Sequence, residues 1–366
     1  MNSDELRSKV LESISERELD ERLEKKIELL GGLCDRKTAM LLVAHELGID
    51  DNETTIGDMD ESARSASFAA VVLSVLSMRS FSRDDGSAGV VANLFVGDES
   101  GTARVVLWDE VAELVKSGKV SEGKCYRFSG RLKDGRDGRE LHIDRWGNIT
   151  PLKKLINPAF EPAPLSSLNV GMEADVLVRV LSSSPLRTFS RKDGSEGAMR
   201  EAMVADESGY MGTVLWDRAA SFEPLESGNV LEVRRARMKE GRLTCELHLG
   251  AFSHMALSEK SVVWSPEITP LSGLRMGQLC CVEGMVSGIG ELRSFQRGDD
   301  KDEGVLSELH LSDNDDRARV VLWGEHAHAV KELDFGEHIR VLFCTVRDGR
   351  DGPELSTTKL SIVEKL

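Results

Sequence analysis

Three tryptophans recur along the chain at nearly equal spacing, each at the end of an apolar run. Trp108, Trp216 and Trp323 are 108 and 107 residues apart. Alternate residues of a strand face opposite sides of a sheet, so an extended run places Arg104 on the same face as Trp108, and Arg319 on the same face as Trp323. An indole ring and a guanidinium group on one exposed face can stack on a flat aromatic ligand and pair with an anion. These pairs are therefore candidates for a binding face.

A lone tryptophan on a strand is more often part of a hydrophobic core, because aromatic side chains contribute strongly to core packing. In this pattern, Val105 and Leu107 share the face opposite Trp108 and are the better candidates for the core. The second copy keeps Trp216 but has Gly212 at the arginine position. Since two copies of three combine tryptophan with arginine, we favour a binding role over core packing.

A second pattern, Arg-x-Phe-x-Arg, leads into an acidic, glycine-containing turn in all three copies. If the segment is extended, its three side chains project from one face, with the ring between two guanidinium groups. The simpler alternative is a phenylalanine that closes the core, with solvated arginines beside it. The recurrence of both arginines in three copies favours binding. The residues are Arg79, Phe81, Arg83, Arg187, Phe189, Arg191, Arg293, Phe295 and Arg297.

Aromatic rings flanked by guanidinium groups suit single-stranded nucleic acid. Exposed bases stack on the rings, each stack being worth about 1–3 kcal/mol, while arginines neutralise the phosphates. Duplex DNA hides its base faces, so the same surface discriminates against it. Loops at 133–140, 234–242 and 346–354 add further arginines. Each loop alone is typical of a solvated turn, but together they are placed to close over a nucleic-acid strand.

Residue patterns for catalysis are missing from the sequence. It contains no G-x-x-x-x-G-K-[ST] phosphate loop and no H-E-x-x-H helix, and its six cysteines include no C-x-x-C pair. The acidic pairs Asp98–Glu99 and Asp206–Glu207 belong to a recurring D-E-S-G turn, which turn chemistry explains without a metal. We therefore expect no catalytic residue, no metal site, no cofactor and no enzyme activity.

The spacing that relates the tryptophans extends to neighbouring positions. The central phenylalanines are 108 and 106 residues apart, and Leu141, Leu247 and Leu355 are 106 and 108 apart. Co-spaced markers over about a hundred residues indicate three copies of one domain. The first copy is expected to form strands near 67–81 and 90–96, a third ending at Trp108, a fourth near 124–132 and a last one around Leu141, with a short helix at 109–118. This is the plan of the OB-fold, a five-stranded Greek-key barrel.

The first fifty residues follow a different pattern. Ser3 and Ser15 are plausible N-caps, and glycines at 31–32 and 48 are plausible stops. They predict three short helices near 4–13, 16–30 and 35–47. The fold class is mostly β, three tandem OB-folds preceded by a small helical module. The predicted domains are a helical module at 1–53, OB-folds at 54–150, 166–258 and 271–366, and proline-containing linkers at 151–165 and 259–270.

Charge is distributed unevenly over these segments. The chain carries 47 Lys and Arg against 63 Asp and Glu, a net charge of −16. Residues 267–366 alone hold 12 basic and 19 acidic residues, whereas 54–266 is nearly neutral and leaves room for a basic stripe. The sequence has no long apolar run, and its acidic start is unlike a signal peptide, so we expect no membrane contact and a cytoplasmic location.

With three copies of strand, D-E-S-G turn and V-x-L-W in place, the chain resembles archaeal replication protein A, a multi-OB single-stranded DNA-binding protein. The segment GGLCDRKTAMLLVAHELGID at 31–50 is similar to the helical segment before the first OB-fold of that family. The resemblance implies that Trp108, Trp216 and Trp323 stack on bases. It also implies DNA contacts from Arg104 and Arg319, and from the loop that holds Arg79, Phe81 and Arg83.

Three features depart from the family pattern. The chain lacks the cysteine set of the C-terminal zinc finger that many members carry, and the segment 133–140 has no match to a second stacking aromatic residue. The third copy is acidic, which is a disadvantage against phosphate.

Two functions stay open. The favoured one is a non-catalytic protein for DNA replication, recombination and repair, with single-stranded DNA as partner. Further subunits or replication proteins would then bind through the third OB-fold or the helices. The alternative is an OB-fold scaffold that binds proteins, which the net charge suits better.

Overall fold

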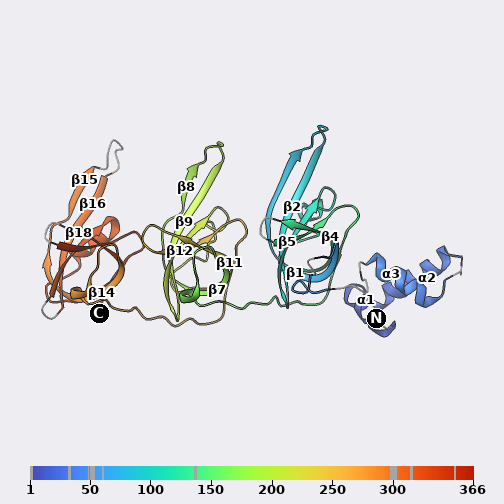
Figure 1. Cartoon of the computed structure of the whole chain (residues 1–366), viewed down its shortest axis with the longest axis horizontal. Helices are drawn as coiled ribbons and strands as arrows, with labels where there is room; N and C mark the ends of the chain where they lie inside the picture. The colour runs from blue at the N-terminus through green and yellow to red at the C-terminus, as the bar shows by residue number, and fades with distance from the viewer. Residues whose placement is uncertain are drawn as a thin grey trace. The chain divides into compact units, whose positions relative to one another are not determined.

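Three β-sheets, one for each sequence repeat, form most of the chain (Figure 1). In each sheet the five principal strands pair in the order first, second, third, fifth, fourth and back to the first, which closes a barrel. The third and fifth strands pair in parallel and the other neighbours are antiparallel. This is the predicted OB-fold topology, and the mostly β fold class is confirmed.

The computed structural model describes residues 3–31, 34–47, 49, 54–59, 62–135, 138–296, 303–313, 316–349 and 352–366. The first barrel consists of β1 (Ser65–Ser82), β2 (Ala88–Asp98), β3 (Gly101–Trp108), β4 (Cys125–Gly135) and β5 (Gly138–Ile143). The second consists of β7 (Glu173–Ser183), β9 (Glu196–Asp206), β10 (Gly209–Trp216), β11 (Val230–Glu240) and β12 (Cys245–Leu249). The third consists of β14 (Leu279–Ile289), β16 (Glu303–Asp313), β17 (Asp316–Trp323), β18 (His338–Gly349) and β19 (Gly352–Ser356).

The barrels contain short strands that the five-strand prediction lacks. A final strand pairs with the fourth strand of each barrel: β6 (Asn148–Pro151), β13 (His254–Leu257) and β20 (Ile362–Lys365). In the second and third barrels the Arg-x-Phe segment forms separate strands, β8 (Arg187–Ser190) and β15 (Arg293–Gln296). In the first barrel the same segment continues the long strand β1. In all three it builds the hairpin that projects from the barrel (Figure 1).

The helix predicted between the third and fourth strands differs from copy to copy. It is α4 (Glu113–Lys116) in the first barrel and the 3-10 helix η3 (Gly324–Lys331) in the third. The prediction that the second copy follows the same scheme is wrong here, because its described residues between Trp216 and Val230 form no helix. Pro224 lies in this segment, lacks an N–H group and disfavours a helical conformation in the residue before it. Two further 3-10 turns, η1 (Leu165–Ser167) and η2 (Leu271–Gly273), precede barrels two and three.

The alternation along the third strand matches the predicted parity. Val105 and Leu107 are fully buried in the first core, whereas Trp108 and Arg104 lie on the other face and are partly exposed. The third barrel repeats this arrangement along β17. The tryptophans are therefore not part of the barrel cores.

In the first two barrels, the aspartate of the D-E-S-G turn forms hydrogen bonds with the segment that precedes the first strand. The Asp98 carboxylate accepts hydrogen bonds from the N–H groups of Ser100 (2.8 Å) and Ile56 (2.7 Å). Asp206 does the same for Ser208 and Leu165, both at 2.7 Å. These turns need no metal to account for their acidic residues.

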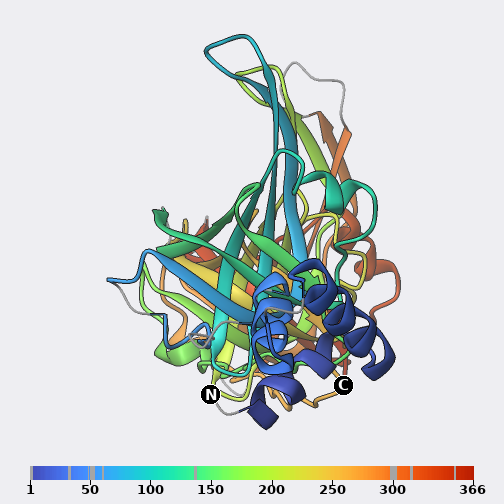
Figure 2. The ribbon, with the colours of Figure 1, turned by 90° about the vertical axis from the view of Figure 1, so that its right-hand side faces the viewer.

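The N-terminal residues form three helices that pack on one another, shown in blue in Figure 2: α1 (Ser3–Ser13), α2 (Glu16–Leu29) and α3 (Arg36–Glu46). Ser15 caps α2 as predicted, by accepting a hydrogen bond from the N–H of Glu18. Ser3 is already the first helical residue, and Asp35 caps α3 through the N–H of Thr38. No helix among the described residues is long and apolar enough to cross a membrane.

Polar contacts join the helices to the first barrel. The guanidinium group of Arg127, on β4, is buried and donates to the Ser13 hydroxyl at 3.0 Å. The side chains of Asn148 and Thr150 donate to the carbonyl groups of Glu46 and Leu47 at 2.9 and 3.0 Å. Packing divides the chain into two units, Met1–Glu161 with the helices and first barrel, and Pro162–Leu366 with the other barrels.

Candidate nucleic-acid interface

Three rings meet on the outer face of the first barrel. Phe81 lies on β1 directly across from Gly89 on β2, and its ring occupies the space that a Cβ atom at Gly89 would need. The edge of one ring points at the face of the other in the Phe81–Trp108 pair, at 6.0 Å between centroids and 86° between planes. His142, from β5, stacks on Trp108 at 5.9 Å and 23°. The hairpin, the third strand and the fifth strand thus each provide one ring.

A hydrogen-bond chain fixes the orientation of the indole. Trp108 Nε1 donates to His142 Nδ1 at 3.0 Å, and His142 Nε2 lies 3.3 Å from a carboxylate oxygen of Glu140. Because Nδ1 accepts, the imidazole proton is on Nε2 and points at Glu140. Burial, helped by the positive charges of Lys133 and Arg104, lowers the pKa of His142 and so favours the neutral ring.

The predicted contact residue Arg104 lies on the same face and is held by two neighbours. Its Nη2 donates to Asn93 Oδ1 at 2.7 Å and its Nη1 to Glu140 Oε1 at 2.9 Å. Glu140 therefore contacts both the arginine and the histidine that supports Trp108. This network orients a guanidinium group beside the stacked rings.

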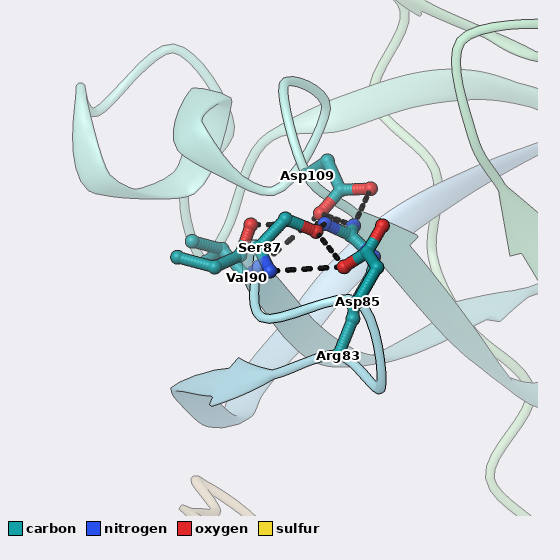
Figure 3. Close-up of polar contacts among 6 residues, drawn as sticks. Arg83, Asp85, Ser87, Val90 and Asp109 are labelled. Atoms are coloured by element: carbon teal, nitrogen blue, oxygen red, sulfur yellow. Dashed lines mark hydrogen bonds and ion pairs between the residues drawn. The ribbon is translucent and has the colours of Figure 1, made fainter.

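The second arginine of the Arg-x-Phe-x-Arg pattern is also fixed. Arg83 donates to both carboxylate oxygens of Asp109 at 2.5 Å (Figure 3). Its guanidinium carbon lies 5.5 Å from the centre of the Phe81 ring. Asp109 has a φ of 52°, a left-handed conformation that aspartate tolerates better than most residues. The turn between β1 and β2 is stabilised by Asp85, which accepts from the N–H and hydroxyl of Ser87 (Figure 3).

Two hollows flank the ring cluster, and Phe81, Trp108 and His142 line both. The smaller hollow, of about 480 Å³, is also lined by Arg79, Arg104, Asn93 and Glu140. The larger, of about 730 Å³, is also lined by Arg83, Arg131, Lys133, Asp84, Asp85, Asp109 and Asp144. The rings thus stand between two concave surfaces that each contain cationic groups.

The second barrel repeats the ring cluster. Phe189 and Trp216 meet edge to face at 6.2 Å and 85°, and His248 stacks on Trp216 at 6.3 Å and accepts its N–H at 3.2 Å. Arg191 donates to Asp217 at 2.5 Å and lies 5.8 Å from the Phe189 ring. Burial and the charge of Lys239 lower the pKa of His248.

The third barrel keeps the rings but changes their support. Phe295 and Trp323 meet at 5.6 Å and 84°, and Trp323 Nε1 donates to the hydroxyl of Ser356 at 3.0 Å instead of to a histidine. Arg319 is held by two carboxylates, Glu308 at 2.6 Å and Glu354 at 2.9 Å. The hydrogen bond and positive charge of Arg319 lower the pKa of Glu308.

The remaining predicted residues are less enclosed. Arg79, Arg187 and Arg293 are exposed on the hairpins, each two residues before the phenylalanine and on the same strand face. Arg297 lies outside the described residues. Sequence reasoning missed His142, His248, Glu140, Asp109 and Asp217. The repeated dipeptides Leu-His at 141–142 and 247–248, and Trp-Asp at 108–109 and 216–217, are the patterns that could have identified them.

The chain is similar over 78% of its length to a curated protein named Replication factor A from Methanothermobacter thermautotrophicus, with 26% identity over 317 residues. This confirms the resemblance inferred from the sequence. The matched region covers 38% of that relative, so the chain spans well under half of the relative's length. No protein-family model matches the chain.

Solved structures of similar proteins include a replication protein A heterotrimer bound to ssDNA. That similarity covers 86% of this chain and 96% of the other, at 10% identity and a TM-score of 0.43. The second OB-fold domain of replication protein A from Methanococcus maripaludis is 28% identical, covers 29% of this chain and 99% of its own, and has a TM-score of 0.24. A replication factor A related protein from Methanobacterium thermoautotrophicum is 29% identical, with 27% and 91% covered and a TM-score of 0.25.

Proposed function

We propose that this chain, a homologue of an archaeal Replication factor A, is a non-catalytic protein that binds single-stranded DNA. Bases stack on the ring clusters and arginines neutralise the phosphates. In this function the protein coats and protects single strands in the cytoplasm during DNA replication, recombination and repair.

The observation that carries this proposal is the placement of the ring clusters. In all three barrels a tryptophan and a phenylalanine meet edge to face outside the core, and in the first barrel hollows with cationic groups flank them. A residue that only packed a core would be enclosed by its own barrel. Three equivalent clusters offer several stacking positions on one chain, which suits a ligand with repeated flat bases.

We assign protein partners, including other subunits, to the third barrel and the helices. Arg319 is held between two carboxylates, Glu308 and Glu354, so one negative charge is in excess at this position, whereas Arg104 of the first barrel faces a single carboxylate, Glu140. The same observation favours the second candidate function, a scaffold whose OB-folds bind proteins. The binding test on the tryptophans separates the two candidates.

The test replaces Trp108 and Trp216 by alanine in one chain. The affinity for single-stranded DNA should fall by roughly 2–6 kcal/mol, because each stacked base contributes about 1–3 kcal/mol. The fold should persist, since both indoles lie outside the cores. Fluorescence anisotropy of labelled oligo-dT measures the affinity, and circular dichroism checks the fold.

Phenylalanine at the same two positions is the matched control, because it keeps a ring for stacking and should keep most of the affinity. Unchanged binding by the alanine variant would overturn the stacking role. Loss of the fold in that variant would show that the tryptophans stabilise the barrels instead.

A further inference from the structure

The outer face of the second barrel lacks an arginine that the other two barrels have. Arg104 in the first barrel and Arg319 in the third each pair with a glutamate from the fifth strand. The equivalent position in the second barrel is Gly212, whose partner across the parallel strands is Glu246. The space beside Gly212 is open, because a Cβ atom there would meet only Glu246, at an ordinary 3.6 Å.

Two glutamates of the second barrel face this gap. Glu201, on β9, lies where the first barrel has Asn93, fifteen residues before the tryptophan. Burial and the negative charge of Glu201 raise the pKa of Glu246. The two carboxylates therefore lack the cation that Arg104 and Arg319 provide at this position in the other barrels.

That cation comes from the third barrel. Lys359, in the turn after β19, forms an ion pair with Glu201. The turn is fixed on the second barrel by the Ser182 hydroxyl, which donates to the Leu360 carbonyl at 2.7 Å. Within the turn, the N–H of Thr358 donates to the Ser361 hydroxyl at 2.8 Å, and that hydroxyl donates to the Phe343 carbonyl at 2.8 Å. Lys359 is thus held at the second barrel's face.

An apolar contact fixes the two barrels to each other. Tyr210 of the second barrel lies 5.1 Å from the ring of Phe343 of the third, and Trp264 from the connecting segment stacks on Phe343 at 5.9 Å. The Tyr210 hydroxyl donates to the carbonyl of Leu279 at 3.2 Å. Cys281 and Leu342 are buried in the same cluster. The lysine is therefore supplied by a packed interface.

A cleft of about 580 Å³ lies between these barrels, next to the acidic pair. It is lined by Glu201, Gly212 and Glu246 from the second barrel, and by Lys359 and Leu360 from the third. Two more cations and a third carboxylate line it: Arg242 from the second barrel, and Arg347 and Asp348 from the third. Val214 also lines it, on the strand that ends two residues later at Trp216.

We propose that barrels two and three bind single-stranded DNA as one unit, in which Lys359 supplies the phosphate-binding cation that the second barrel lacks at Gly212. This inference rests on the proposed function and extends it to a composite site. A strand stacked on Trp216 continues into the cleft, where Lys359, Arg242 and Arg347 contact its phosphates.

The test measures binding of oligo-dT to the full chain over a range of salt concentrations. For single strands, the slope of log K against log salt decreases in magnitude by about 0.7 for each phosphate that the protein no longer neutralises. Lys359→Ala should reduce the slope by about this amount and weaken binding about fivefold near 0.1 M salt. Lys365→Ala is the matched control. It removes the same charge from the same barrel, but its ammonium group pairs with Glu337 instead of lining the cleft.

A rescue variant separates ligand contact from structural support. Adding Gly212→Arg to Lys359→Ala restores an arginine at the position used by the other barrels, and should restore the affinity and the slope. Equal binding by Lys359→Ala and Lys365→Ala, with intact binding by the wild-type chain, would overturn the composite site alone. Failure of the rescue would also overturn it and assign Lys359 to interface support. Absence of binding by the wild-type chain would overturn the proposed function itself.

Discussion

The indole N–H group of each outer tryptophan needs an acceptor because the ring is half-buried. Two barrels provide histidine, and the third provides serine. The histidine ring both stacks on the indole and accepts its N–H group, but only the neutral form of histidine can accept at Nδ1. The three sites therefore differ in how they respond to acid.

Acidification should change two of the three indole environments. The lowered pKa values of His142 and His248 mean that the folded chain binds these protons less tightly than the unfolded chain does. The two neutral histidines therefore stabilise the folded chain above pH 6.5, the ordinary pKa of histidine. This stabilisation is lost as pH falls through their lowered pKa values. In NMR spectra, the indole N–H signals of Trp108 and Trp216 should shift in this range below pH 6.5.

The Trp323 signal is the internal control, because Ser356 does not titrate. His142→Ser should remove the shift of Trp108 and leave that of Trp216. Equal shifts of all three signals would contradict the hydrogen-bond assignment.

The residue after the tryptophan has a positive φ in every barrel: Asp109, Asp217 and Gly324. Glycine adopts this conformation without strain, whereas the two aspartates use their carboxylates to pair with arginine. Asp109→Ala and Asp109→Gly both remove that pair. The alanine variant should be less stable than the glycine variant by about 1 kcal/mol, because only alanine has a Cβ to strain.

Urea unfolding of the two Asp109 variants measures this difference. Both variants should also release Arg83 from its position over the Phe81 ring. Equal unfolding free energies would show that the left-handed conformation carries no strain at this position.

At this scale the sequence predicted which side chains lie on the outer face but not the residues that support them. Strand parity alone places Trp108 and Arg104 on the outer face. His142 reaches Trp108 only because β3 and β5 pair in parallel, with Val106 opposite His142. That register joins residues more than thirty positions apart, and no local pattern specifies it.

The hairpin of each barrel has one recurring cross-strand pair. Phe81 lies opposite Gly89, Phe189 opposite Gly197, and Phe295 opposite Gly304. A Cβ atom at any of these glycines would lie 2.4–2.6 Å from the ring. The bare glycine backbone thus lets the ring lie flat across the hairpin and reach the tryptophan.

Gly89→Ala should displace the Phe81 ring from this position. We expect a loss of affinity for single-stranded DNA of about 1–3 kcal/mol, the value of a single base stack. Gly101→Ala is the control, because its Cβ would meet only Ile56, at 3.8 Å. Titration of both variants with the same oligonucleotide makes the comparison. Equal affinities would show that the Phe81 ring does not contribute.

At the element scale, the five strands of each barrel could be predicted because apolar alternation and glycine turns recur three times. The short strands β6, β13 and β20 could not, since each follows an irregular turn and depends on pairing with the fourth strand. The helix that similarity to the first copy predicts for the second does not form among the described residues, because Pro224 disfavours a helix there.

Over the whole molecule, the repeats are similar in fold but differ in charge and contacts. The first barrel joins the helices through Arg127, and the second and third share the interface around Tyr210. The acidic residues are concentrated at the two ends of the sequence, in 1–53 and 267–366. Net charge alone would therefore misjudge the nearly neutral middle of the chain, where two of the ring clusters lie.

The central claim is tested most directly by comparing oligo-dT of about 30 nucleotides with a duplex of equal length, at two salt concentrations. Each OB-fold covers about 4–16 nucleotides, so this length can engage more than one barrel. Our account predicts tight binding of the single strand, weakened by salt, and much weaker binding of the duplex. Equal binding of both forms, or no binding at low salt, would contradict it.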